Sequence, residues 1–401
     1  MRARWLASLM LACGPLPPAG SGGTTEGGGT AGDGDASSEG EVPTGGTTGS
    51  SAPTSMGETT GETTDETAGA PVIDCSQPVL LPDESVARAV RLSLGLPEGP
   101  VPVDRLADLV GLEVPSFLEV ATLEGLQCFP NLVNVRLGSS SVSDLGPLAG
   151  MTKLEGIDVR STALADLGPL ATLPALQRLA LQSDAVVDYA PLAGHPAMRE
   201  MRVEGTTAVS LEPLAKIPNL WLVSLTACGL TDIAGLAGAG ALVEVNVSDN
   251  QISDLSPLAG STSLMTLYAY RNPLAGLTGL EELPALLELN VVETGLTELV
   301  AVAPDSLVWL VANDNNIADL SPLAGHVQLE AVLLQRNAVT SLAPIAQAPW
   351  AGDPCARLDV IGNPLDQETL EVVLPEICAF GVHIDTELAE CVAMGDVLCD
   401  G

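Results

Sequence analysis

Aromatic and basic residues are scarce in this chain of 401 residues, and each shortage excludes a class of function. Phe, Trp and Tyr make up only 2% of a chain that is 46% hydrophobic, so Leu, Val and Ala must carry the packing. Lys and Arg number 15 against 51 Asp and Glu, which gives a formal net charge of −36. A protein that binds a phosphate backbone or an anionic membrane surface needs a basic surface. We therefore expect neither as a partner.

The first 13 residues, MRARWLASLMLAC, have the composition of an export signal, with two arginines before a short apolar run. The run is far shorter than the roughly 20 residues needed to cross a bilayer. Its end, Met10-Leu11-Ala12-Cys13, resembles the lipobox of bacterial lipoproteins, although leucine is usual where Met10 stands. The resemblance implies an envelope or outer-membrane lipoprotein anchored through Cys13. In the alternative, a plain signal peptide is cut nearby, Cys13 is lost and the protein is secreted.

Residues 14–71 contain mostly Gly, Thr, Ser and Pro, with nine acidic residues and no Lys or Arg. Such a segment cannot bury enough apolar surface to offset the entropy lost on ordering, so we expect a disordered linker. Beyond it, Asp83 is a typical N-cap, and apolar residues at helical spacing predict a helix over 84–94 that ends at Gly95. A second short helix is expected over 104–109.

From residue 132 onward the chain is built of a repeat of 22 residues. Its units start at Leu132, Leu154, Leu176, Met198, Leu220, Leu242, Leu264, Leu286, Leu307 and Leu329. Positions 1, 4 and 6 are apolar in every unit. Position 9, here called the polar column, is filled by Ser140, Thr162, Asp184, Thr206, Cys228, Asn250, Asn272, Thr294, Asn315 and Asn337. A short polar side chain that points inward can hydrogen-bond the backbone of adjacent units, which predicts a tightly coiled stack.

The pattern L-x-x-L-x-L-x-x-N-x-I-x-D-L-x-P-L-A-G resembles the bacterial leucine-rich repeats of the internalin-like class. The resemblance implies an α/β solenoid with a curved parallel β-sheet on its concave face. Short 3₁₀ turns would form the convex face, and helical caps would close both ends. The expected segments are 1–13 signal peptide, 14–71 linker, 72–131 N-terminal cap, 132–365 repeats, and 366–401 C-terminal cap with an acidic tail.

Aspartate recurs at position 13 of the units, where it can cap a tight turn, and proline follows three residues later. Gly235, Gly279 and Ala301 replace that proline in three units. We interpret these replacements as local weakening of the packing. Near the C-terminus, Asp366 is expected to cap a helix.

The eight cysteines divide by position. Cys13 is the candidate for lipidation, and Cys228 lies in the polar column, where we expect a buried reduced thiol. The other six lie towards the two ends of the array, namely Cys75, Cys128, Cys355, Cys378, Cys391 and Cys399. An even set in an exported chain points to disulfides. We expect Cys75–Cys128 at one end. Cys355–Cys378 and Cys391–Cys399 are our pairing at the other, where the connectivity stays open.

Residues suited to catalysis are few. The chain has no G-x-S-x-G, H-E-x-x-H or G-x-x-x-x-G-K motif, and its cysteines lack the C-x-x-C spacing of zinc sites. Its three histidines are His195, His326 and His383. His195 and His326 occupy equivalent positions six repeats apart, about 30 Å at the usual spacing of strands, so they cannot share a site. We expect no enzyme, no cofactor and no metal.

Function is therefore expected on the concave face, at positions 3, 5, 7 and 8 of the units. Six arginines stand there, namely Arg136, Arg160, Arg178, Arg202, Arg271 and Arg336. Tyr268, Tyr270 and Trp309 share this face, and aromatic residues and Arg dominate the hot spots of protein interfaces. In the alternative interpretation these side chains are merely solvated, and the arginines balance Glu200, Glu204, Glu244 and Glu288.

The sequence thus predicts a monomeric, non-enzymatic, exported protein that binds a protein partner. Tyr268, Tyr270 and Trp309 would supply buried contact area. The arginines expected to steer an acidic partner are Arg178, Arg202, Arg271 and Arg336. The alternative from another class is a structural component of the envelope without a dedicated ligand.

Overall fold

The computed structural model describes residues 73–160, 163–183, 185–186, 188–206, 210–300, 302–303, 305–346, 356–379, 383–386 and 390–391. The chain divides into two units, and every described residue belongs to the second, Val72–Cys399. The predicted export signal with Cys13, the linker 14–71 and the cysteines Cys355 and Cys399 lie outside the described residues.

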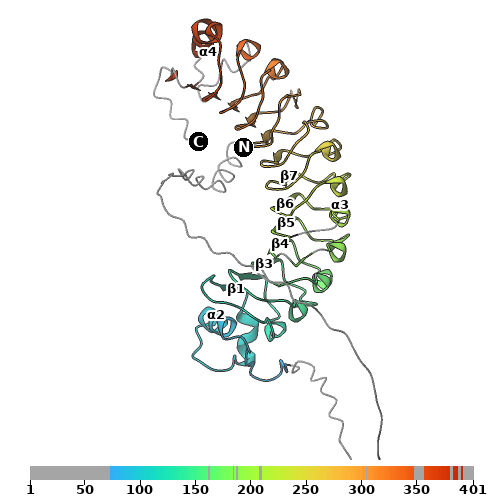
Figure 1. The fold of residues 1–401 in the computed structure, drawn as a ribbon. Coiled ribbons are helices and arrows are strands. Elements are labelled where there is room, and N and C mark those ends of the chain that lie inside the picture. The colour runs from blue at the N-terminus through green and yellow to red at the C-terminus, as the bar shows by residue number, and fades with distance from the viewer. Residues whose placement is uncertain are drawn as a thin grey trace, which may run out of the picture. The chain divides into compact units, whose positions relative to one another are not determined.

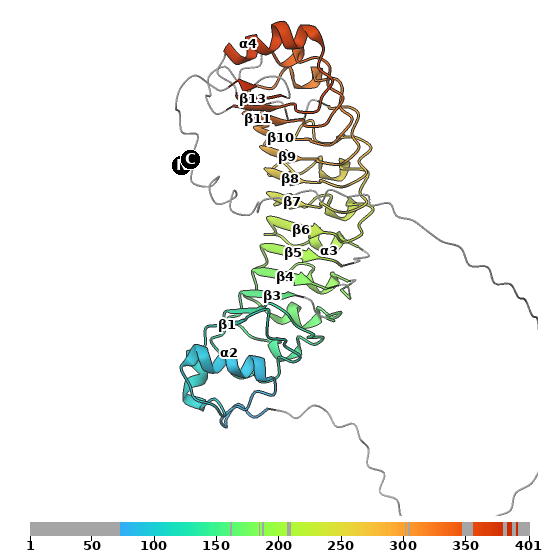
Figure 2. The same cartoon turned by 60° about the vertical axis from the view of Figure 1, so that its left-hand side comes forward.

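In the described part of the chain, fourteen strands form one sheet in which the order in space follows the order in the sequence (Figures 1 and 2). The strands are β1 (Gly111–Val114), β2 (Asn134–Leu137), β3 (Gly156–Arg160), β4 (Arg178–Gln182), β5 (Glu200–Glu204), β6 (Leu222–Thr226), β7 (Glu244–Asn246), β8 (Thr266–Tyr268), β9 (Glu288–Asn290), β10 (Trp309–Val311), β11 (Ala331–Leu333), β12 (Arg357–Asp359), β13 (His383–Asp385) and β14 (Glu390–Cys391). All neighbours pair in parallel except β13 and β14. Each of the ten repeat units supplies one strand, β2 to β11, so the predicted parallel sheet is confirmed.

The core lies on one side of this sheet and follows the leucine pattern. Equivalent residues pair across strands, as Val245 with Leu267 and Leu267 with Leu289. Because successive side chains of a strand point to opposite faces, position 4 enters the core while positions 3 and 5 face outward. Leu242, Val245 and Val247 are fully buried. The three apolar positions of one unit therefore pack against those of the next, and stacking supplies the core that no single unit has.

In the described part of the chain, short helical turns lie opposite the sheet in every unit except those at Leu264 and Leu286 (Figure 1). They are η4 (Gly146–Leu148), η5 (Gly168–Thr172), η6 (Ala190–Leu192), α3 (Glu212–Ala215), η7 (Ala234–Leu236), η8 (Ser256–Leu258), η9 (Ser321–Leu323) and η10 (Ala343–Ile345). All are 3₁₀ turns except the α-helical α3. Asp144 and Asp254 each accept the backbone N–H two residues on, at 2.6 and 2.8 Å. The predicted capping by position 13 is confirmed at these turns.

Gly235 shows why glycine replaces proline at one turn. A Cβ atom at this position would lie 2.5 Å from the backbone nitrogen of Glu212 and 2.6 Å from the carbonyl carbon of Leu211. The preceding turn is α3, whose backbone approaches closely. Gly235 is thus required by a close contact between two turns, which differs from the loose packing inferred from the sequence.

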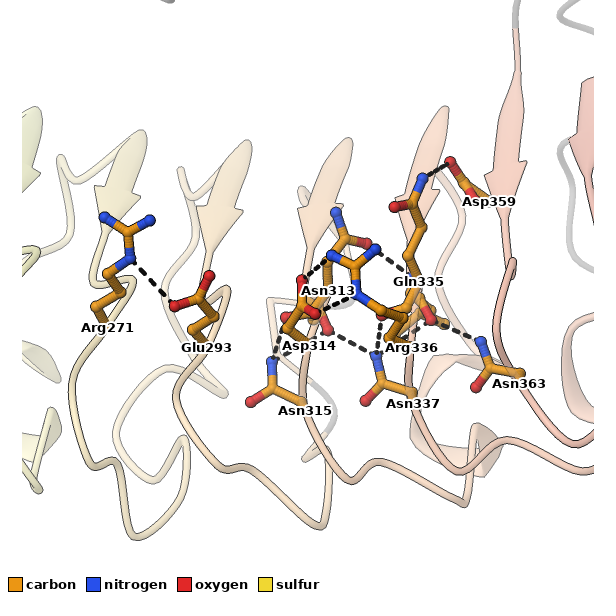
Figure 3. Close-up of polar contacts among 12 residues, drawn as sticks. Arg271, Glu293, Asn313, Asp314, Asn315, Gln335, Arg336, Asn337, Asp359 and Asn363 are labelled. Atoms are coloured by element: carbon orange, nitrogen blue, oxygen red, sulfur yellow. Dashed lines mark hydrogen bonds and ion pairs between the residues drawn. The ribbon is translucent and has the colours of Figure 1, made fainter. Parts of the chain in front are cut away.

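Members of the polar column hydrogen-bond adjacent units inside the solenoid, as Figure 3 shows for Asn315 and Asn337. The Asn315 side chain donates to the carbonyls of Val291, Ala312 and Asn313 at 2.8 to 3.1 Å, and its Oδ1 accepts the backbone N–H groups of Thr294 and Leu296. Other members bond in the same way, including Asn250, Asn272, Asn337 and, after the last unit, Asn363. The predicted inward role of position 9 is confirmed at these residues.

The N-terminal end carries the predicted helix. Helix α2 (Glu84–Leu94) begins after Asp83, whose Oδ1 accepts the backbone N–H of Val86 at 3.0 Å, and it ends at Gly95 in the left-handed conformation. The 3₁₀ turn η2 (Val103–Asp108) follows where a second short helix was expected, and η3 (Leu126–Cys128) precedes the first unit. The predicted disulfide Cys75–Cys128 is confirmed.

At the C-terminal end the π-helical turn η11 (Thr369–Val373) runs into helix α4 (Leu374–Ala379). Asp366 Oδ1 accepts the backbone N–H of Thr369 at 2.7 Å, so Asp366 caps this segment as expected. Cys378 is disulfide-bonded, and its expected partner Cys355 lies outside the described residues. The remaining pairing, Cys391–Cys399, stays a prediction.

Candidate partner-binding face

The open face of the sheet carries the side chains of positions 3, 5 and 7, which point away from the core. Strand register brings equivalent positions side by side, so that Arg136 lies beside Asp158, Asp158 beside Ala180, and Ala180 beside Arg202. Residues far apart in the sequence therefore meet on this face. Two groups of side chains occupy it, one over β1 to β5 and one over β8 to β10.

The first group lines a depression of about 670 Å³ over β1 to β5, here called the arginine hollow. Its charged lining residues are Glu113, Arg136, Asp158, Arg160, Arg178 and Arg202. Four arginines and two carboxylates give these residues a formal charge of +2, or +1 when Glu200, which pairs with Arg202, is counted, against −36 for the chain. The hollow is therefore a positive region on a strongly acidic protein.

The arginines of the hollow are only partly neutralised. Asp158 lies between two of them, 3.3 Å from Arg136 and 3.1 Å from Arg160, and Arg202 pairs with Glu200 at 2.8 Å. The side chains of Arg136, Arg160 and Arg202 are nevertheless 63%, 59% and 51% exposed. Exposed ion pairs of this kind contribute about 0–1 kcal/mol, so their guanidinium groups are available to a stronger anionic ligand.

Arg178 is held across a neighbouring strand. Its Nη2 donates to the amide oxygen of Asn134 on β2 at 2.8 Å, and the side chain must cross β3 to reach it. Gly156 on β3 makes the crossing possible, since a Cβ there would lie 3.1 Å from Arg178 Nη2 and 2.5 Å from Asn134 Oδ1. Among the described residues Arg178 forms no ion pair. Its charge is thus fixed in place by a neutral partner.

The second group, here called the aromatic group, consists of Tyr268, Tyr270 and Trp309. In register, Tyr268 lies between Asn246 and Asn290, and Trp309 lies between Glu288 and Ala331. All three side chains are half-buried, so they lie partly against the sheet.

Two carboxylates share the face with the aromatic group. Glu244 and Glu288 occupy equivalent positions on β7 and β9, with Thr266 of β8 between them. Burial raises the pKa of both, although Arg202 opposes the rise at Glu244 and a hydrogen bond with Tyr268 opposes it at Glu288. A raised pKa means that the ionised forms are poorly solvated here, which favours contact with a hydrogen-bond donor.

Arg271 and Arg336 lie just beyond the ends of the strands rather than among the arginines of the hollow (Figure 3). Arg271 pairs with Asp249 at 3.3 Å and Glu293 at 3.2 Å, and its guanidinium lies 5.8 Å from the ring centroid of Tyr270. Arg336 pairs with Asp314. Both arginines are thus matched by carboxylates of adjacent units, and with Asp249, Glu293 and Asp314 they form a charged edge of two arginines and three carboxylates.

Residues at position 8 of the units have a backbone conformation that we did not predict from the sequence. The residues of this position with positive φ are Gly205, Ala227, Asp249, Arg271, Glu293, Asp314 and Arg336. A left-handed conformation costs a non-glycine residue about 1–2 kcal/mol. This conformation lets the backbone N–H of Asp249 donate to the carbonyl of Tyr270 at 3.0 Å. The backbone N–H of Asp314 likewise donates to the carbonyl of Gln335 at 2.8 Å. In the sequence, Gly205, Asp249 and Asp314 indicated this conformation, because glycine and, less often, aspartate adopt positive φ.

The structure therefore separates the predicted site residues into three places. Arg178 and Arg202 lie together in the hollow, Tyr268, Tyr270 and Trp309 form the aromatic group, and Arg271 and Arg336 belong to the charged edge. Gly156, Asn134 and Asp158 complete the hollow and were not among the predicted residues. In the sequence, this arrangement is indicated by Gly156 at position 3 of one unit and Arg178 at position 3 of the next.

His195, His326 and the free cysteine Cys228 are buried inside the solenoid. Cys228 is buried and reduced, as predicted, and burial raises the pKa of its thiol. His195 Nε2 donates to the Leu173 carbonyl at 3.0 Å and His326 Nε2 to the Val302 carbonyl at 2.7 Å. Each buried imidazole ties its unit to the preceding one. Over the described ranges no helix is both long and apolar enough to traverse a bilayer.

Comparison with known proteins supports the fold. No family model matches the chain, and no curated protein matches it in sequence. An internalin, InlF, from Listeria monocytogenes is similar over 78% of this chain and 98% of its own, with 21% identity and a TM-score of 0.59. The chain is a leucine-rich repeat solenoid. Its ten units, single sheet and opposing 3₁₀ turns agree with that assignment.

A second similar structure is the leucine-rich repeat ectodomain of the plant receptor kinase GASSHO1/SCHENGEN3 from Arabidopsis thaliana, solved in complex with Casparian strip integrity factor 2. It is similar over 69% of this chain and 35% of its own, with 16% identity and a TM-score of 0.54. At such identities the likeness concerns the fold of the solenoid alone.

Proposed function

We propose that this solenoid is a non-enzymatic binding module that recognises a protein partner through the open face of its sheet. The aromatic group carries the proposal. The chain has only 4 Trp and 3 Tyr, yet Tyr268, Tyr270 and Trp309 all lie on this face within three neighbouring units. Such side chains supply most of the energy of protein interfaces because they bury a large area at little cost in side-chain entropy.

The setting of the aromatic group supports contact with a protein. Half-buried rings need little rearrangement to pack against a partner, so less entropy is lost on binding. Glu244 and Glu288 beside the rings are poorly solvated and would accept hydrogen bonds from the partner. The plant ectodomain, which shares the solenoid fold, was solved in complex with Casparian strip integrity factor 2, so the fold accommodates a bound partner.

Crosslinking capture with the full chain tests the proposal. The double variant Tyr268→Ala, Trp309→Ala should lose specific partners that the native chain retains. Phe117→Ala is the matched control, because Phe117 is 80% exposed and lies outside the aromatic group. If native protein and double variant retrieve the same proteins, the aromatic group is not the binding site.

We further propose that the protein is exported as a monomer and held at the cell envelope by a lipid on Cys13. The sequence Met10-Leu11-Ala12-Cys13 after a short apolar run supports the anchor. Metabolic labelling with a palmitate analogue should mark the native chain and fail to mark Cys13→Ser. No label on the native chain, or label that persists in the variant, would leave secretion as the proposal.

The second candidate is a structural component of the envelope without a ligand. The charged edge favours it, because Arg271 and Arg336 are already paired with carboxylates of the chain itself. Under this proposal the Tyr268→Ala, Trp309→Ala variant would change neither partner capture nor any property of the cell envelope, while loss of the whole chain would weaken the envelope.

A further inference from the structure

We infer that the arginine hollow is a distinct subsite for a carboxylate-rich peptide segment of a protein partner. The inference rests on the proposed function and adds a second place on the same face, several strands away from the aromatic group. Of the four arginines predicted to steer an acidic partner, it keeps this role for Arg178 and Arg202. Counting Glu200, the hollow has four arginines against three carboxylates and could bind further acidic residues, whereas Arg271 and Arg336 already face the three carboxylates of the charged edge.

The charges of the hollow match an acidic partner. Its lining carries +2 formally on a chain of −36, so an acidic segment would meet repulsion over most of the protein and attraction here. Asp158 already sits between Arg136 and Arg160, which shows that guanidinium groups on this face are spaced to engage a carboxylate. Arginine binds carboxylates through two parallel N–H donors, an arrangement that adds geometric specificity.

The spacing of the arginines favours an extended peptide over a single compact anion. They come one each from β2, β3, β4 and β5. Strands lie about 4.8 Å apart, so the four Cα positions span about 14 Å along the solenoid. One phosphate or sulfate group spans only a few ångströms. Several carboxylates spaced along an extended chain can reach all four arginines, and a hollow of about 670 Å³ has room for a few residues.

Arg178 is the residue best prepared for this role. It lies over Gly156 and is held by Asn134, so its guanidinium is fixed in the centre of the hollow without an ion pair among the described residues. A preorganised charge loses little side-chain entropy when the ligand arrives. Gly156→Ala would place a methyl group 3.1 Å from Arg178 Nη2 and would displace the side chain while keeping its charge.

Calorimetric titration of the full chain with an oligo-glutamate peptide tests the subsite, with oligo-glutamine as the uncharged control. Arg178→Gln should weaken binding of the glutamate peptide about tenfold, the loss of one charge-assisted contact. Gly156→Ala should weaken it to a lesser degree. Arg336→Gln removes the same charge from the charged edge and should leave the affinity within about twofold of the native value.

Four results would overturn the inference. The glutamate peptide could bind no more tightly than the glutamine peptide, or Arg336→Gln could weaken it as much as Arg178→Gln, which would show only an effect of net charge. Inorganic phosphate or a sulfated oligosaccharide could bind more tightly and be lost with Arg178→Gln. The peptide could bind only after the acidic residues of 14–71 are replaced by amides, which would make the chain's own linker the occupant. Partner capture through the aromatic group is measured separately, so either proposal can fail alone.

Discussion

Replacing Asn315 with alanine should lower the free energy of unfolding by about 2–6 kcal/mol, because two buried backbone N–H groups would lose their acceptor. Those groups belong to Thr294 and Leu296, which bond Asn315 Oδ1 at 3.1 and 3.0 Å. Each orphaned donor costs about 1–3 kcal/mol. The carbonyls that Asn315 now contacts keep a second lone pair and contribute less.

The number of backbone N–H groups that each asparagine of the polar column accepts predicts a rank order for the loss of stability on substitution with alanine. Asn337 Oδ1 accepts one backbone N–H, that of Ile317 at 3.0 Å, so Asn337→Ala should cost about half as much as Asn315→Ala, about 1–3 kcal/mol. Asn316 is exposed and adjacent in the sequence, and Asn316→Ala should change the stability by less than about 0.5 kcal/mol.

Urea unfolding followed by circular dichroism measures all three variants. Because repeat arrays can unfold in parts, midpoint and slope should both be compared, with the sheet signal as probe. Equal midpoints for Asn315→Ala and Asn316→Ala would refute the role of the polar column in satisfying the backbone. A larger loss for Asn337→Ala than for Asn315→Ala would refute the counting of orphaned donors.

Three further predictions concern a histidine, a disulfide and a glycine. Burial lowers the pKa of His195 in the folded chain. Below about pH 6.5 the unfolded chain therefore binds a proton that the folded chain does not, and the free energy of unfolding should fall as the pH drops further. Between about pH 7.5 and about pH 5.5 the melting temperature of His195→Gln should decrease less than that of the native protein. Replacing Cys75 and Cys128 by serine should cost about 2–4 kcal/mol in urea unfolding, and an unchanged midpoint would count against the disulfide. Gly235→Pro, which restores the common residue of the turn, should destabilise by about 1–3 kcal/mol through overpacking. Gly240→Ala is its control, since a Cβ there meets nothing within 4 Å, and equal melting temperatures for the two variants would contradict the close contact at Gly235.

Local and periodic features could be predicted because each depends on neighbours in the sequence or on an equivalent residue one unit away. Asp83 and Gly95 bound helix α2 as expected, and the polar column bonds the backbone as expected. The disulfide Cys75–Cys128 followed from counting cysteines at one end of the array. The left-handed column at position 8 could not be predicted from Ala227, Arg271 or Glu293, since those residue types give no sign of positive φ.

The candidate site was predictable only as a set of residues on one face. Arg178, Arg202, Arg271 and Arg336 look alike in the sequence, yet two line the hollow and two belong to the charged edge. That division depends on which side chains the strand register places beside each arginine. Gly156 matters only because Arg178 of the next strand crosses it to reach Asn134 of the strand before.

The sequence by itself determined the solenoid, because its apolar residues and its polar column recur with a nearly constant period, and a repeat of that kind can bury its core only by stacking. Only the tertiary structure decided which charges meet on the open face. The period says that equivalent residues become neighbours, but hydrogen bonds and ion pairs depend on the length and direction of each side chain. The crossing of Arg178 over Gly156 and the pairing of Arg336 with Asp314 arise at that level.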